Sequence, residues 1–262
     1  MSLNVDAWFA LGDWRGRHNF FCHGYRAFER DLHVVILGTL EAGNSHVERQ
    51  YKKESRSLKV KLKQAEGHYQ EWLESSCAEL SEEKWDQQRF FRNMATVAIA
   101  TRLIQALRKL LGTAERFKAR KPCRDKSKSE ILRLWTELGD CYGIDISGNA
   151  ERIAFATSLN DVRNQIVHDG GNANSSLPFA QCNPEGGDAG LLDLRFSTKY
   201  PQYVEGSESS AEVNVSMKQV QQFGDDSLKL LNWVADELWN EQLKCRKAEV
   251  ECPALFVPVD ER

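Results

Sequence analysis

The sequence predicts a mainly α protein, a helical bundle with long helices and a small β-hairpin insertion. Residues 26–80 contain no proline, and their apolar residues recur three or four positions apart, as on the buried side of a helix. A similar apolar pattern near the end of the chain, around Leu230, Trp233 and Leu238, predicts a final long helix. Two short runs of alternating polarity, at 191–196 and 213–217, are typical of strands.

The elements of the first half follow from this pattern. We expect residues 1–25, which are rich in aromatics and interrupted by glycine, to form a lead-in that covers the core. One or two long helices follow over 26–80, with a break near Gly43. Ser81 stands before two glutamates and is placed to cap a further apolar helix over 90–111, which the next glycine would end.

The second half predicts two more helices and an insertion. We expect residues 129–142 to form a helix and Ser147 or Asn149 to cap the next one. That helix carries a stripe that we expect to face the core: Phe155, Leu159, Val162 and Ile166. Residues 172–216 are rich in loop-forming types and contain the predicted hairpin. The chain from 26 to 262 is therefore predicted to be a single helical domain with a loop and hairpin insertion at about 172–216.

Composition limits the class of protein. The net charge of −3 is not the basic footprint typical of a nucleic-acid binder, so any such binding must use a local patch. The seven cysteines are scattered, without a CxxC pair, and no signal-like apolar stretch or membrane span is present, so we expect a cytoplasmic protein with reduced thiols. No zinc spacing or phosphate-binding glycine loop appears, and we expect neither a metal nor a cofactor.

The candidate site is the run from Arg163 to Gly171, in which Asn164 follows the arginine and His168 precedes Asp-Gly-Gly. On a continuous helix the side chains of Arg163 and His168 would point about 140° apart, so their convergence requires the helix to end. The two glycines favour that ending. Metal-independent RNA cleavage needs a group that accepts the 2′-OH proton, donors for the phosphate and a proton for the leaving oxygen, and His, Arg and Asn suit these roles.

The segment Leu159-Asn-Asp-Val-Arg-Asn-Gln-Ile-Val-His168 resembles the Arg-polar-x(3–5)-His motif of the HEPN superfamily, near the end of a core helix. The resemblance implies a HEPN-like helical bundle and a metal-independent endoribonuclease that leaves a 2′,3′-cyclic phosphate. It implies a homodimer in which Arg163, Asn164 and His168 of both chains form one composite site. It further implies a toxin or antiviral effector, acting on single-stranded RNA or tRNA loops, with an antitoxin or defence-system partner protein.

Alternatives stay open at this point. Arg163 and His168 are also typical of a plain helix end, with the arginine paired to Asp161 or Asp169, in a catalytically inactive HEPN-like binding or scaffold module. Nucleotide binding or nucleotidyl transfer is a third option. A basic run in the 115–128 loop is either a solvated surface or an RNA-binding rim, formed by Arg116, Lys118, Arg120, Lys121, Arg124, Lys126 and Lys128.

Overall fold

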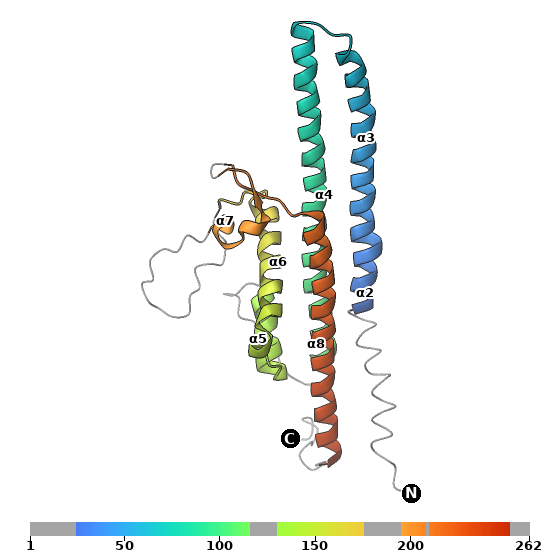
Figure 1. Ribbon diagram of the computed structural model, residues 1–262. Helices are drawn as coiled ribbons and strands as arrows, with labels where there is room; N and C mark the ends of the chain where they lie inside the picture. Colours follow the sequence, from blue (N-terminus) through green and yellow to red (C-terminus); the bar gives the residue numbers. More distant parts are fainter. Residues whose placement is uncertain (1–24, 116–129, 176–194, 208–209, 252–262) are drawn as a thin grey trace, which may run out of the picture. The chain divides into compact units, whose positions relative to one another are not determined.

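The computed structural model describes residues 25–115, 130–175, 195–207 and 210–251 of the chain (Figure 1). The elements are α2 (Tyr25–Arg30), the π-helix η1 (Asp31–Leu37), α3 (Gly38–Leu62), α4 (His68–Glu115), α5 (Glu130–Tyr142), the 3-10 helix η2 (Ser147–Asn149), α6 (Ala150–His168), α7 (Phe196–Lys199), the 3-10 helix η3 (Pro201–Tyr203), β1 (Val204–Glu205), β2 (Glu212–Val213) and α8 (Met217–Glu251). The predicted mainly helical fold with a small hairpin is confirmed. The predicted lead-in falls almost wholly on residues 1–24, outside the described residues.

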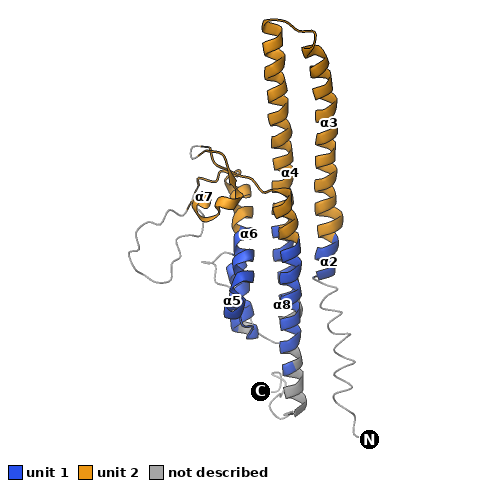
Figure 2. Cartoon of the chain, viewed as in Figure 1, with its two compact units in different colours: residues 1–30, 100–160, 225–262 blue, residues 31–99, 161–224 orange. Residues whose placement is uncertain are grey.

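The chain separates into two compact units, which Figure 2 colours differently. Unit 1 joins residues 1–30, 100–160 and 225–262, and unit 2 joins residues 31–99 and 161–224. The border crosses α4, α6 and α8, so each of these helices contributes to both units. The predicted catalytic residues lie in the part of α6 that belongs to unit 2. Within the described ranges, no helix has both the length and the apolar character needed to cross a bilayer.

Unit 1 contains apolar stripes at helical spacing. In α5, Ile131, Leu134 and Leu138 are buried, as their predicted position on one side of a helix requires. In α8, Leu230 and Val234 are buried in the same way. The spacing of apolar residues in the sequence therefore predicted both helices and their buried sides.

The turn before α6 differs from the predicted cap. Ser147 and Asn149 lie in η2, and their side chains bond to Asp145. Oδ1 of Asp145 accepts hydrogen bonds from Oγ of Ser147 over 2.7 Å and from the backbone N–H of Gly148 over 3.1 Å. These bonds lower the pKa of the Asp145 carboxyl. The acceptor that organises this turn is thus Asp145, which the sequence analysis did not single out.

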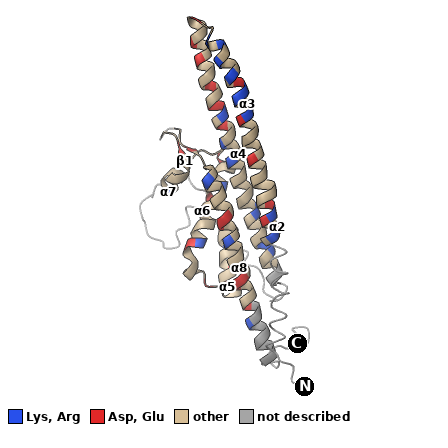
Figure 3. Cartoon of the chain, turned by 45° about the vertical axis from the view of Figure 1, so that its right-hand side comes forward, with Lys and Arg blue, Asp and Glu red and all other residues tan. Residues whose placement is uncertain are grey.

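In unit 2, α3 and the first part of α4 run side by side in opposite directions (Figure 1), and Lys and Arg recur along α3 (Figure 3). The turn between them contains Gly67, at φ +58°. The predicted break near Gly43 is wrong, because Gly43 lies inside α3. A Cβ at Gly43 would lie 2.8 Å from Cε1 of Phe91 in α4. Gly43 thus permits a close approach of two helices and interrupts neither.

The predicted start and stop of the helix over 90–111 are also wrong. α4 is one helix of 48 residues, and Ser81 lies inside it. Oγ of Ser81 donates to the carbonyl oxygen of Cys77, one turn earlier, instead of capping a helix end. Gly112 does not end α4, which continues to Glu115.

The hairpin is present, but both strands differ from the prediction. Of the predicted strand at 213–217 only Val213 lies in β2, and Met217 begins α8. β1 pairs antiparallel with β2, with Val204 opposite Val213. Of the predicted strand at 191–196, residues 191–194 lie outside the described residues, and Phe196 begins the short helix α7. Phe196 and Tyr200, four positions apart, are both buried, so a helical turn places the two rings on one side. The four-residue spacing of these aromatics is typical of a helical turn and not of the predicted strand.

We expect Gly43→Ala to lower the free energy of unfolding by about 1–3 kcal/mol, because the added methyl group would overlap the Phe91 ring. Gly38→Ala in the same helix is the matched control, since its nearest contact would be the His33 carbonyl oxygen at an ordinary 3.5 Å. This control should instead gain up to about 1 kcal/mol from helix propensity. Urea unfolding measures both variants, and equal stabilities would contradict the close-approach role of Gly43.

Candidate functional site

Helix α6 carries all three predicted catalytic residues near its C-terminal end. Of the predicted apolar stripe, Leu159 and Val162 are fully buried, whereas its first and last residues are only partly buried. The helix ends at His168. Gly170, at φ +61°, and Gly171, at φ +86°, adopt left-handed conformations just after this end. The predicted glycine ending of this helix is confirmed.

Arg163 and Asn164 contact one another directly. Nη1 of Arg163 donates a hydrogen bond to Oδ1 of Asn164 over 2.7 Å. Asn164 is 6% exposed, so its amide is held in place and fixes the position of the guanidinium. Nε of Arg163 is buried and has no hydrogen-bond partner among the described residues. Since a guanidinium has five N–H donors, Arg163 keeps donors for a further oxygen ligand.

Neither of the nearby carboxylates pairs with Arg163 in the part of the chain that the structure describes. Oδ2 of Asp161 accepts hydrogen bonds from the Tyr200 hydroxyl over 2.7 Å and from Nζ of Lys199 over 3.0 Å. Burial and the Asp161 charge raise the pKa of the Tyr200 phenol. Asp161 is therefore engaged by α7 and its flank, and Asp169 forms no ion pair with a described residue. The simple ion pair considered for Arg163 is not formed.

His168 is exposed at the last position of α6. Because α6 continues to His168, the glycine turn begins too late to bring this ring beside Arg163 in one chain. Five helical steps leave the two side chains about 140° apart. In a single copy, Arg163 and Asn164 therefore lie together at the end of α6, and His168 lies apart from them on another side of the helix.

The turn after α6 is held by Gln165, which the sequence analysis did not single out. Nε2 of this fully buried side chain donates to the carbonyl oxygen of Asn172 and to Oγ of Ser175. The backbone N–H of Gly171 donates to the Gln165 carbonyl oxygen over 3.1 Å. In turn, the Gly171 carbonyl accepts a hydrogen bond from the N–H of Val213 in β2, over 2.7 Å. The end of α6 is therefore bonded to the hairpin.

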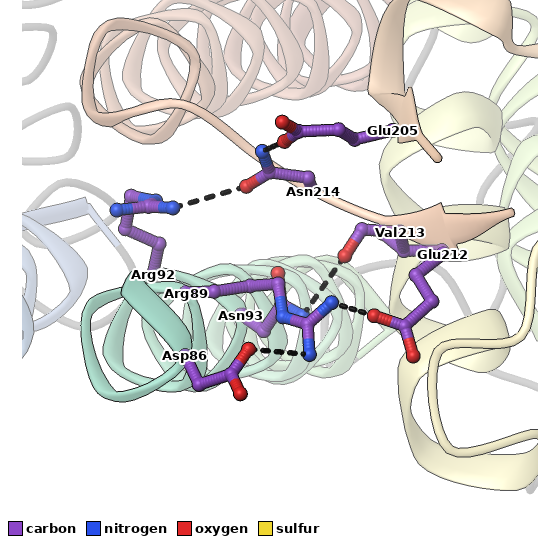
Figure 4. A network of polar contacts seen from close by, with 8 residues as sticks. All are labelled: Asp86, Arg89, Arg92, Asn93, Glu205, Glu212, Val213 and Asn214. Atoms are coloured by element: carbon purple, nitrogen blue, oxygen red, sulfur yellow. Dashed lines mark hydrogen bonds and ion pairs between the residues drawn. The ribbon is translucent and has the colours of Figure 1, made fainter. Parts of the chain in front are cut away.

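A polar network joins the hairpin to α4 (Figure 4). Nε of Arg92 donates to the Val215 carbonyl over 2.8 Å, and Nη2 donates to Oδ1 of Asn214 over 3.0 Å. Nδ2 of Asn93 donates to the Val213 carbonyl over 3.2 Å. Arg89 adds an ion pair with Glu212, and Asn214 also bonds to Glu205. Partial burial lowers the pKa of Arg92, which nevertheless stays charged. These α4 residues position the hairpin and, through it, the turn after His168.

The remaining predicted features have separate outcomes. The predicted RNA-binding residues Arg116, Lys118, Arg120, Lys121 and Arg124 lie outside the described residues, as do Lys126 and Lys128. No group of three or more His, Cys, Asp and Glu residues in the described ranges could hold a metal ion. Among the described residues, the functional groups of the candidate site therefore come from α6 and from the residues that hold its C-terminal end.

We expect Arg92→Ala to lower the free energy of unfolding by about 2–3 kcal/mol, because the Val215 carbonyl and the Asn214 amide would lose a charged donor. Arg92→Lys should recover only part of this loss, since an ammonium cannot reproduce two bonds in a fixed plane. Arg56→Ala, at an exposed position of α3, is the control and should stay within about 0.5 kcal/mol of wild type. Chemical denaturation measures all three, and an Arg92→Ala protein as stable as the control would exclude the positioning role.

Comparisons of the chain with family models, with curated proteins and with solved structures find no match. The function proposed for this site therefore depends on its residues, on their geometry and on the resemblance of its ten-residue motif.

Proposed function

We propose that the protein is a metal-independent HEPN endoribonuclease that cleaves single-stranded RNA or tRNA loops as a homodimer. The observation that carries the proposal is the state of Arg163. Its guanidinium is fixed by Asn164, has a buried Nε without a partner among the described residues, and pairs with neither Asp161 nor Asp169 there. A partly buried cation in this state suits an anionic ligand, and a phosphate offers the oxygens that a guanidinium binds two at a time.

The proposed reaction uses one histidine as base and another as acid. The base accepts the 2′-OH proton, the 2′-oxygen attacks phosphorus, and the bond from phosphorus to the 5′-oxygen breaks. The acid protonates that leaving oxygen, and the first product is a 2′,3′-cyclic phosphate. Arg163 stabilises the charge on the phosphate, and Asn164 orients Arg163. The two His168 residues of the proposed homodimer would take these two roles, one as base and one as acid.

The geometry of one helix end supports the proposed homodimer. Arg163 and His168 point about 140° apart in a single copy, so one chain cannot aim both at the same phosphate. Two copies related by a two-fold axis can place the exposed His168 of each near the Arg163 of the other. The wider role, a toxin or antiviral effector with an antitoxin or defence-system partner, is proposed from the motif resemblance.

A non-catalytic binding or scaffold module is the second candidate. One observation favours it: the aromatic rings of Tyr69 and Trp72, near the start of α4, are stacked at 5.8 Å and more than half exposed, as on a surface that binds a partner. In that case Arg163 and His168 would be dispensable for function. Cleavage and its dependence on these two residues therefore separate the candidates.

We expect purified wild-type protein to cleave total RNA or tRNA in the presence of EDTA. His168→Ala and Arg163→Ala should each lose at least about a hundredfold in rate, the scale of removing a general acid or base or a phosphate-binding cation. His68→Ala is the matched control, because His68 is an exposed histidine far along the chain and bonds to Glu71 alone among described residues. Its rate should equal that of wild type.

All variants must first be shown to be folded and equally dimeric. If wild type cleaves no RNA, or if His168→Ala and Arg163→Ala cleave as fast as His68→Ala, these residues are not catalytic. The binding-module candidate would then take the place of the nuclease.

A further inference from the structure

Helix α3 carries an unusual concentration of positive charge. Residues 49–63 contain seven Lys or Arg and one acid, Glu54. Six of the cations lie on one side, which we call the α3 basic stripe: Arg49, Lys52, Lys53, Arg56, Lys59 and Lys63. All six are exposed, and Lys63, which follows the last residue of α3, keeps helical backbone angles.

Helix geometry shows that the stripe faces away from α4. Tyr51 marks the side of α3 that contacts α4, since its hydroxyl lies 3.4 Å from Oγ of Ser81 and its ring lies under Nζ of Lys84. At about 100° per residue, the six cations occupy a sector from about 80° to about 200° from Tyr51. Lys61 and Glu54 fall outside this sector. The stripe spans 14 helical steps, or about 21 Å.

The described carboxylates of α3 and α4 form no ion pair with the α3 basic stripe. None of its six cations forms an ion pair with a described residue. The charge of Lys52 helps to lower the pKa of Glu48, one turn earlier. The Glu48 carboxylate is nevertheless bonded to Nζ of Lys84 and to Nε2 of Gln88 in α4. Since like charges this close repel one another, the stripe is a feature that folding alone does not favour. An anionic partner would relieve this repulsion.

We propose that the α3 basic stripe binds the phosphate backbone of single-stranded RNA, an inference that rests on the proposed nuclease function for its choice of polyanion. A bilayer fits less well, because a helix that lies on a membrane also buries an apolar face, and Val60 is the one large exposed hydrophobic residue of α3. The apolar positions of α3, such as Val47, are taken by packing. The surface left for a partner is a row of cations, which suits a row of phosphates.

The test measures binding apart from cleavage. The probe is a 2′-O-methylated oligouridylate of about 12 nucleotides, long enough to follow the stripe and without the 2′-OH that cleavage requires. Lys52→Gln with Lys53→Gln is compared with a matched double variant, Lys61→Gln with Lys218→Gln. The control removes the same two charges from exposed positions, one on the other flank of α3 and one on α8.

We expect the affinity of the Lys52/Lys53 variant to fall roughly tenfold at about 0.15 M salt, and its salt slope, log K against log salt, to become shallower by about 1.4, since each single-strand phosphate contact contributes about 0.7. The control should bind as wild type does.

Three results would overturn the inference. The first is that wild type does not bind the RNA probe, and the second is that both double variants lose the same affinity for it. The third is that the Lys52/Lys53 variant binds RNA as wild type does but loses binding to anionic vesicles or loses self-association. Binding through the stripe without any RNA cleavage would support the inference and overturn the nuclease instead. Cleavage with unchanged binding in the Lys52/Lys53 variant would do the reverse.

Discussion

Both backbone polar groups of Val213 are engaged, and the candidate site depends on this one peptide segment. Its N–H donates to the Gly171 carbonyl at the end of α6, and its carbonyl accepts from Asn93 in α4. Val213 is 1% exposed, so water cannot replace either bond. The two bonds connect the turn after His168 to a long helix through a strand of two residues. A short hairpin is marginal alone, and here α4 supplies the support that it lacks.

The buried sides of the helices could be predicted from the sequence, because the buried positions of a helix are apolar and recur at helical spacing. Ile131, Leu134 and Leu138 are an example, and the fold class followed from such stripes. Glycine and serine were misjudged because their roles depend on what lies opposite them. Gly43 resembles a helix break in the sequence, yet the Phe91 ring decides its role. No local pattern reveals that contact.

The candidate site divides in the same way. The motif of α6 and its glycine ending were predictable, since both are local in sequence. Gln165 was missed because its partners, 7 and 10 positions further on, are reached only through the path of the turn after α6. Arg92 was missed because its partners come from a distant segment: its Nε bonds to a carbonyl 123 positions away. The engagement of Asp161 by Tyr200, 39 positions away, was also invisible, and it decides whether Arg163 is paired. Long-range hydrogen bonds thus determine what a local motif is free to do.

A net charge of −3 counts against RNA binding only if an RNA phosphate interacts with all the charges of the protein. At physiological salt the screening length is about 8 Å, so a phosphate close to α3 interacts with the α3 basic stripe and little with distant acids. Such a stripe binds the RNA phosphate backbone by charge and does not distinguish one base from another. Any preference for particular nucleotides must then arise where bases meet protein near the cleaved bond. In the proposed nuclease, the stripe would supply affinity and the composite site around Arg163 and His168 would supply selectivity.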